Sequence, residues 1–417
     1  MPSRRHSAAI GCAAVLHVIL VWSVVSQTPD GNAPPTSPRF LTARLFFDAV
    51  NWPGPGGDFY ALYHAGLQAR HGGSPHDPTT IDGDPPYYFR YIYSPLLAHT
   101  LGRCVTLLPP RRAYFLWLGV TEACLWMWLL LFWRADAPLF SRTFAGVALL
   151  AGQPFILELH MGQFTFVAVA LALLAARRWQ TVWGAVLLFM AIVLKTFPLV
   201  VVPAFLGRGS RRPLIAGVTA AGAVFLSSVL GPRGDGHVAL GMVDTIGGPH
   251  PGAESLSQAI YTIAMAMSGF WLPAALPWLP AIVGALCVGM TGWMVLHCRE
   301  SVLLGACAML MAFFLGYLHV WEHHYSAVLL INLVALVEIS RTAQGRSHPA
   351  CRLLLVTAIL FALPSPFALA GPSFSSWSVT WWVALSASKG LPAAVALAAI
   401  LRTLGQDRAP VPQFVDA

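Results

Sequence analysis

The sequence has few charged residues and almost no lysine. Charged residues make up 10% of the chain, and lysine occurs only at Lys195 and Lys389, whereas a soluble domain carries roughly 25% charged residues. This scarcity excludes an ordinary soluble domain. Hydrophobic residues make up 57% and the mean hydropathy is +0.65, so the composition places the chain in a lipid bilayer.

Basic residues lie in short loops rather than on one soluble face. A basic stripe with interleaved aromatic residues is lacking, so nucleic acid is not an expected partner. The net charge of +8 comes almost wholly from arginine. Such clusters between apolar runs are typical of the cytoplasmic side of membrane proteins; they occur at Arg111-Arg112, Arg177-Arg178 and Arg208 to Arg212.

The cysteines show neither a disulfide framework nor a metal pattern. None is spaced as CxxC, and all lie in or beside apolar segments. We therefore expect reduced, buried thiols. The seven residues are Cys12, Cys104, Cys124, Cys287, Cys298, Cys307 and Cys351.

Apolar runs fill most of the chain, and alternating strands of a membrane barrel are not seen. Because backbone polar groups must be paired inside hydrocarbon, the runs predict helices. We expect an all-α polytopic membrane protein, with one membrane domain over residues 1–405 and a cytoplasmic tail at 406–417. About twelve segments approach the roughly 20 residues of a spanning helix: 8–26, 91–109, 113–133, 143–158, 162–176, 181–206, 213–230, 272–297, 301–318, 324–339, 352–370 and 379–401.

Two long polar segments, 27–90 and 232–271, are expected outside the membrane. Arg4 and Arg5 favour a cytoplasmic N-terminus, and the first run is interpreted as an uncleaved helix, with a cleaved signal peptide as the alternative. Simple alternation of twelve spans cannot place the arginines near 134–142, 177–178 and 208–212 on one inner side. We therefore interpret 91–109 and the region of Lys195 as re-entrant or half-spanning segments, broken at prolines.

Asp58 is the first candidate for a catalytic group. It lies in GGDFYALYHAG, where the spacing of aromatic and apolar residues predicts a short amphipathic helix on the outer membrane surface. An aspartate after two glycines also fits a helix N-cap. The two interpretations are compatible, because a helix N-terminus favours the ionised carboxylate that a general base needs.

Lys195 is the second candidate. It lies deep in the apolar run LLFMAIVLKTFPLVVVPAF, where a lysine costs roughly 2.5–3.5 kcal/mol on insertion scales and usually has a partner or a ligand. We expect a lipid-linked phosphate as that ligand. A lysine that snorkels at a helix end beside Pro198 is the alternative.

Two polar interruptions between apolar runs supply further candidates. Gln163 lies in ELHMGQFTF, for which a plain hairpin tip is the alternative. His323 and His324 lie in LHVWEHHYS; the spacing is not HEXXH, and adjacent histidines do not easily share one zinc, so no metal is expected. We expect one of them to contact a phosphate or a sugar, with an interfacial turn as the alternative.

Arg90 and Tyr93 in YYFRYIYSP, with Glu254 and Ser255 in GAESLSQAIY, complete the candidate set. Arg90 is a candidate phosphate ligand, while an aromatic belt also explains the tyrosines. Glu254 and Ser255 are expected to line an acceptor or sugar pocket. A solvated loop is the alternative for that pair.

The order of these motifs resembles family 87 of the GT-C glycosyltransferases, the polyprenyl-phosphate-mannose-dependent mannosyltransferases and their DUF2029-type relatives. The similarity runs over roughly residues 55–340, from GGDFYALYHAG through YxYSPLL, MGQ, LKTFP and ESLSQAI to WEHHYS. Two departures fall at expected substrate contacts: Tyr93-Ser94-Pro95 stands where the family often has YPP, and Ala253-Glu254-Ser255-Leu256 where it often has NQSL.

The resemblance implies an inverting membrane glycosyltransferase with Asp58 as the base. The donor would be a polyprenyl-phosphate sugar, with no other cofactor, and the acceptor a hydroxyl of a glycolipid or cell-envelope glycan. The family's GQ pair falls on Gly162-Gln163, its KxxP element on Lys195 to Pro198, and its histidine pair on His323-His324. We expect a multi-pass protein of the inner or plasma membrane whose active site faces the periplasm or another extracytoplasmic space.

A transporter or flippase of a lipid-linked sugar is the alternative function. An intramembrane lysine and broken helices occur in transporters as well. A transporter is expected to show two related halves, and no clear internal repeat is present. It also gives no reason for a carboxylate on a surface helix.

Overall fold

The computed structural model describes residues 4–27, 54–86, 90–206, 211–230, 254–267, 278–297, 301–341, 348–365 and 378–406. Throughout these ranges the regular elements are helices, as the apolar runs predict. The expected tail at 406–417 lies outside the described residues apart from Gln406. The expected outer segment 232–271 is described only from Glu254 to Met267, where it forms a helix.

Six of the described helices are long and apolar enough to cross a membrane. A seventh span results if α8 (Leu139–Ala151) and α9 (Gln153–Met161), bent by 42° at Gly152, are taken as one. The six are α1 (Arg4–Gln27), α7 (Pro110–Arg134), α13 (Arg211–Leu230), α16 (Leu279–His297), α18 (Tyr325–Ser340), counted from Glu322, and α22 (Val379–Gln406). The protein is therefore a polytopic membrane protein.

Shorter apolar helices account for four of the five remaining expected segments, and one further short helix lies in the segment 232–271 that was expected outside the membrane. Several are too short to cross hydrocarbon about 30 Å thick alone, since a helix rises 1.5 Å per residue. They are α10 (Thr165–Arg177), α11 (Val182–Leu194), η2 (Phe197–Val201) with α12 (Val202–Leu206), α15 (Leu256–Met267), α17 (Val302–Gly316) and α20 (Pro349–Ala362).

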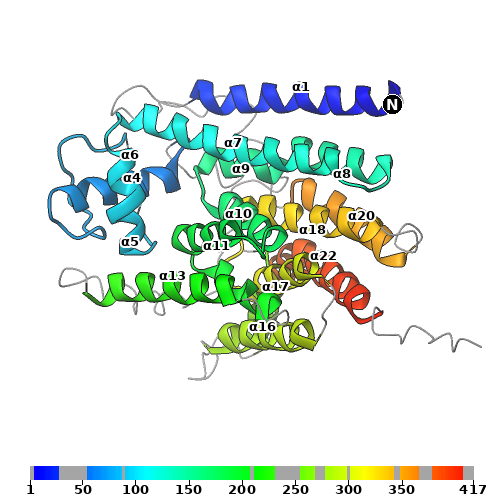
Figure 1. Ribbon diagram of the computed structural model, residues 1–417. Coiled ribbons are helices and arrows are strands. Elements are labelled where there is room, and N and C mark those ends of the chain that lie inside the picture. The colour runs from blue at the N-terminus through cyan, green and yellow to red at the C-terminus, as the bar shows by residue number, and fades with distance from the viewer. Residues whose placement is uncertain are drawn as a thin grey trace, which may run out of the picture.

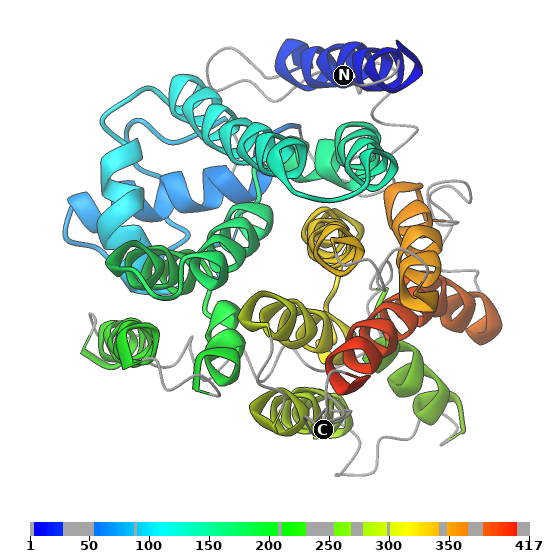
Figure 2. The same cartoon turned by 45° about the vertical axis from the view of Figure 1, so that its right-hand side comes forward.

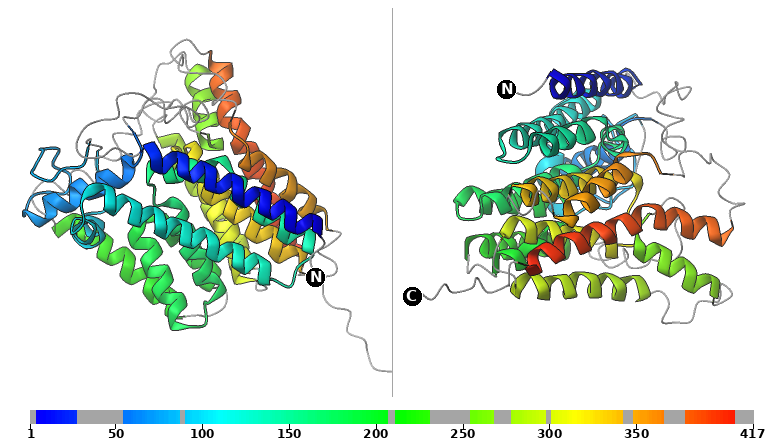
Figure 3. Two further views of the ribbon diagram at one scale, coloured as in Figure 1. Left: turned by 90° about the horizontal axis from the view of Figure 1, so that it is seen from above. Right: turned by 90° about the vertical axis from the view of Figure 1, so that its right-hand side faces the viewer.

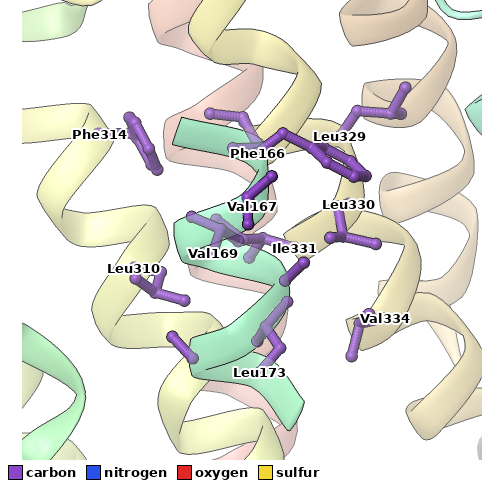
Figure 4. Packing of buried hydrophobic residues seen from close by; sticks show 14 of the residues in the cluster. Phe166, Val167, Val169, Leu173, Leu310, Phe314, Leu329, Leu330, Ile331 and Val334 are labelled. Atoms are coloured by element: carbon purple, nitrogen blue, oxygen red, sulfur yellow. The ribbon is translucent and has the colours of Figure 1, made fainter. Parts of the chain in front are cut away.

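The core of the bundle is built around α18. Nearly all of its residues are buried, and Figure 2 shows this helix, in gold, with other helices on all sides. Phe166 and Leu173 of α10 pack beside Leu310 of α17 and Val334 of α18 in one apolar cluster (Figure 4). Outer helices instead expose large apolar side chains, such as Trp22, Phe225 and Trp293, as lipid-facing surfaces do.

Three arginine clusters gather at one end of the bundle, whereas Arg111-Arg112, at the start of α7, lies at the opposite end of that helix. Arg134, at the end of α7, and Arg177, at the end of α10, line the same pocket. Arg212, in the first turn of α13, donates to the carbonyl of Gln180 at 3.2 Å, just after α10. The N-terminal end of α1 lies beside the last turns of α7 at this end (Figure 1, Figure 3). We call it the basic end.

The region of Lys195 is re-entrant, as predicted. The chain leaves the basic end along α11, and the helix stops at Lys195, whose backbone is extended. Phe197 then stacks on Phe313 near the end of α17, with ring centroids 4.8 Å apart, while Ala204 lies against Gly305 near its start. Because α17 starts at the basic end, where Leu303 lines the same pocket, the chain returns to that end.

The segment 91–109 also does not cross the bundle. It forms α5 (Pro95–Leu97), the π-helix η1 (Ala98–Gly102) and α6 (Arg103–Val105), which together make one short helix with a π-helical turn in its middle. If this segment and the Lys195 region are not counted as membrane spans, the arginines near 134–142, 177–178 and 208–212 all lie on one side of the membrane. The conflict found in the sequence is thus resolved.

The helix predicted after Asp58 forms, but it does not lie on the surface with one polar side exposed. It is α4 (Gly57–Arg70), and every residue from Gly57 to Ala69 is buried. Its Gly66 meets the backbone of Gly102, so closely that a Cβ there would lie 2.3 Å from the Gly102 carbonyl. The expectation of an amphipathic helix is corrected, because η1, α6 and α7 cover the side that was assigned to water.

Hydrogen bonds of the buried His17 ring fasten α1 to the bundle. The ring of His17 places Nε2 3.0 Å from a carboxylate oxygen of Glu122 on α7, and Nδ1 3.0 Å from the carbonyl of Leu150 on α8. Trp126 donates to the same carboxylate at 3.0 Å. These polar contacts inside the apolar region fix the position of α1 against two neighbours.

Candidate active site

Asp58 lies in the first turn of α4 and points into the protein. Gly56, with φ of 94°, is the N-cap residue, and no side chain caps the helix. The backbone N–H of Gly56 donates to the carbonyl of His160 at 2.6 Å. The N-cap interpretation of Asp58 is therefore wrong: its carboxylate accepts hydrogen bonds from Tyr93 and Gln163 instead of from backbone amides.

Gln163 connects Asp58 to two other candidates. Its Nε2 donates to Oδ2 of Asp58 at 3.1 Å and lies 3.3 Å from Nε2 of His323. Its Oε1 accepts from the hydroxyl of Tyr93 at 3.1 Å, and that hydroxyl also lies 3.3 Å from Oδ1 of Asp58. Gly162, with φ of 65°, ends α9 and turns the chain so that Gln163 faces this cluster.

Lys195 reaches the same cluster from the break after α11. Its Nζ donates to the hydroxyl of Thr165 at 2.7 Å and lies 5.4 Å from the centroid of the Tyr93 ring. Its charge acts on both Asp58 and Glu158. The structure thus gives Lys195 protein partners inside the bundle, which the alternative of a snorkelling lysine does not provide.

Glu158 supports the cluster from behind. It is completely buried, and it accepts from the backbone N–H of Phe166 at 2.7 Å and from the hydroxyl of Ser326 at 3.1 Å. These bonds tie α9 to the first turns of α10 and α18. In the sequence, Glu158 is recognisable only as a charged residue that interrupts an apolar run. No sequence pattern indicates a functional role for Thr165 or Ser326.

Burial sets the protonation of the carboxylate at the centre. Desolvation raises the pKa of Asp58 from 3.8 to about 6, while the charge of Lys195 and the hydrogen bonds from Tyr93 and Gln163 lower it. Burial also raises the pKa of the Tyr93 hydroxyl well above its usual value, so that it remains a donor. Asp58 is therefore mostly ionised at neutral pH and more basic than an exposed aspartate, as general-base catalysis requires.

The two histidines of the predicted pair differ in their surroundings. His323 lies against Gln163, and its Nδ1 is buried without a hydrogen-bond partner among the described residues. His324 uses its Nδ1 to accept from the backbone N–H of Trp321 at 3.0 Å, so it shapes the turn. The two rings are tilted by 59° with centroids 4.2 Å apart, and of the pair it is His323 that joins the cluster.

The remaining candidates take no part in the hydrogen bonds around Asp58. Glu254 donates its backbone N–H to the carbonyl of Val320 at 2.7 Å, and the hydroxyl of Ser255 donates to the carbonyl of Leu318 at 3.3 Å. Both residues thus pack at the start of α15 against the loop that leads to His323. Arg90 is exposed.

The outer segment also contains Asp82-Gly83-Asp84, the DxD spacing that nucleotide-sugar enzymes use to hold a metal ion. Asp84 is already engaged: its Oδ1 lies 2.7 Å from Nδ1 of His64, and its Oδ2 accepts from the backbone N–H of Ile81 at 2.8 Å. Asp82 is exposed. Within the described ranges, no three metal-ligating side chains are grouped for an ion.

The fold and the cluster define a class of protein: a polytopic helical membrane protein with a buried carboxylate and amide beside a half-buried tyrosine and lysine at one end of the bundle. Residues 91–321 of the chain match glycosyltransferase family 87, more than half of its length. The chain belongs to this family, as the sequence resemblance implied, and is a membrane glycosyltransferase. A comparison with curated proteins gives no match.

The matched range holds only part of the cluster. It includes Tyr93, Gln163 and Lys195, whereas Asp58 precedes it and His323 follows it. Hydrogen bonds nevertheless join these two residues to the matched part through Gln163.

Proposed function

We propose that the protein transfers a sugar, mannose in the first instance, from a polyprenyl-phosphate donor to a hydroxyl of a glycolipid or cell-envelope glycan. The observation that carries this proposal is the buried carboxylate of Asp58, whose pKa of about 6 suits a general base. Three donors or cations from other parts of the chain surround it: Tyr93, Gln163 and Lys195.

In the proposed reaction Asp58 accepts the proton of the acceptor hydroxyl. The hydroxyl oxygen forms a bond to the anomeric carbon while the bond from that carbon to the phosphate oxygen breaks. The electron pair leaves with the polyprenyl phosphate. A single base opposite the leaving group gives inversion at the anomeric carbon.

Lys195 and His323 are the proposed contacts of the leaving phosphate. A phosphate needs no protonation to leave when a cation stabilises its growing charge. Lys195 supplies that charge beside the Tyr93 ring, and the buried Nδ1 of His323 has a free hydrogen-bonding position. Tyr93 and Gln163 hold the base in position. Arg90, Glu254, Ser255 and His324 stay candidate contacts for more distant parts of the substrates.

The proposed reaction takes place on the outer side of the inner or plasma membrane. The arginine clusters at the basic end are expected in the cytoplasm. The Asp58 cluster lies at the opposite ends of α10 and α18, near Thr165 and Ser326. The arrangement therefore favours an active site that opens away from the cytoplasm.

Replacing Asp58 by Asn tests the base directly. In membranes supplied with polyprenyl-phosphate mannose and native lipid extract, we expect Asp58→Asn to lower product formation by about 100- to 10,000-fold, the usual contribution of a general base. Asp82→Asn is the matched control, because Asp82 lies in the same outer segment and is exposed. Full activity of folded Asp58→Asn would falsify the assignment of Asp58.

One observation favours the alternative of a flippase. The helix break at Lys195 is the kind of discontinuity at which transporters bind substrates. Liposomes that contain the purified protein and a lipid-linked sugar, but no acceptor, separate the two functions. Movement of the sugar lipid between leaflets without transfer would support the flippase.

A further inference from the structure

A pocket at the basic end combines an apolar floor with a charged rim. Its volume is about 170 Å³, and it lies between the last turns of α7, α10 and α18 and the first turn of α17. Leu131, Phe132 and Val334 belong to the floor, and Arg134, Arg177 and Arg341 to the rim. Helices α10 and α18 start at the Asp58 cluster and end at the pocket. The pocket and the Asp58 cluster therefore lie at opposite ends of the bundle.

The charges of the rim match a phosphodiester. The three arginines stand with two carboxylates, Asp136 and Glu338, which leaves one net positive charge. Glu338 accepts from Nη1 of Arg341 at 2.9 Å, so it holds that guanidinium beside the pocket. Arginine is well suited to bind phosphate oxygens with two parallel hydrogen bonds.

Trp128 adds a buried hydrogen-bond donor to the lining of the pocket. Its indole lines the pocket and is 1% exposed. Its Nε1 has no hydrogen-bond partner in the described part of the chain. Buried donors are nearly always paired, and a phosphate or glycerol oxygen in the pocket would accept from this N–H.

We infer that this pocket binds the headgroup of an anionic phospholipid, such as phosphatidylglycerol. Basic pockets between membrane helices on the cytoplasmic side are a known mode of lipid headgroup binding. The phosphate lies between the guanidinium groups, and the acyl chains follow α7, where Leu130 and Trp133 are exposed beside the rim. The inference concerns the opposite end from the active site and shares with the proposed function only the expected cytoplasmic position of the basic end.

Short-chain phosphatidylglycerol added to the delipidated full-length protein tests this site. Native mass spectrometry counts bound lipid, and the shift in melting temperature gives its affinity. We expect one tightly bound lipid, at least fivefold weaker binding in Arg177→Gln and in Arg341→Gln, and a smaller loss in Trp128→Phe, which keeps the ring but not the N–H. Arg178→Gln is the matched control, because Arg178 is the exposed neighbour of Arg177 and does not line the pocket.

Three results would overturn the inference. One is unchanged affinity in both Arg177→Gln and Arg341→Gln. Another is equal binding of short-chain phosphatidylcholine, which carries no net charge. The third is displacement of the lipid by inorganic phosphate at equal concentration, which would make the site one for free phosphate. Circular dichroism of each variant confirms that a loss of binding does not reflect unfolding.

Discussion

At the scale of single residues, the environment of Asp58 rather than its position in the sequence gives it chemical use. An exposed aspartate is a weak base at neutral pH. Burial in the bundle raises its pKa to about 6, and the donors Tyr93 and Gln163 limit the rise. The protein thus obtains a stronger base that is still ionised at neutral pH.

This balance predicts the pH dependence of activity. Below pH 6 Asp58 is protonated and cannot accept a proton, so kcat/KM should fall about tenfold per pH unit and reach a plateau above pH 6. Tyr93→Phe removes a hydrogen bond that favours the ionised form, so its midpoint should move to higher pH by about half a unit or more. The measurement is the pH profile of kcat/KM in detergent.

Tyr91→Phe is the control for this profile, because the buried hydroxyl of Tyr91 donates to the carbonyl of Ser94 and not to Asp58. Its midpoint should stay at the wild-type value. A profile of Tyr93→Phe that moves to lower pH, or not at all, would contradict a role for Tyr93 at the base.

The sequence identified Asp58, Tyr93, Gln163 and Lys195 as candidates, but not Glu158 or the hydroxyls of Thr165 and Ser326. Gln163 and Lys195 stand out because each interrupts an apolar run. Thr165 and Ser326 do not, since threonine and serine are common in membrane helices, and their partners lie 30 and 168 positions away. Their role depends on tertiary contacts, which one sequence does not show.

At the scale of elements, α4 positions the base through a close approach of two backbones. Gly66 of α4 meets Gly102 at the end of η1, so the helix can lie deep enough for Asp58 to reach Gln163. The sequence predicted the helix from its periodicity. It did not predict that the helix is buried on all sides, because the covering segments η1 and α6 were expected to enter the membrane separately.

Gly66→Ala should therefore affect catalysis as well as stability. A methyl group there would lie 2.3 Å from the Gly102 carbonyl, and overpacking of this kind costs about 1–3 kcal/mol. A shift of α4 by about 1 Å can cost on the order of 100-fold in rate. Melting temperature and transfer rate are the two measurements.

Gly119→Ala serves as the comparison, since no atom lies within 4 Å of the methyl group it adds to α7. We expect wild-type activity and stability for it. Wild-type activity in Gly66→Ala would show that α4 does not need its close approach to η1.

At the scale of the whole molecule, the bundle has a basic end and an end that carries the Asp58 cluster. The arginines near 134–142, 177–178 and 208–212 share one end, whereas Arg111 and Arg112 begin α7 at the other end, and the number of crossings could not be derived from apolar length alone. The segments around Pro95 and Lys195 have the composition of spans, and only their packing shows that they do not cross.

Cysteine labelling in whole cells tests the orientation. In a background without native cysteines, Asp82→Cys should react with a membrane-impermeant maleimide in intact cells. Gln180→Cys, at the basic end, should react only after permeabilisation. The reverse pattern would place the active site in the cytoplasm and contradict the proposed outer-face reaction.

The hairpin at Lys195 also has a consequence for how the chain is made. Phe197 stacks on Phe313 and meets Phe314 edge to face, and the ribosome adds these two residues on the order of a hundred residues later. Translation proceeds at about 5–20 residues per second. Phe313 and Phe314 are therefore synthesised several seconds or more after Lys195. The active site is therefore among the last parts of the protein to form, after α17 has been inserted.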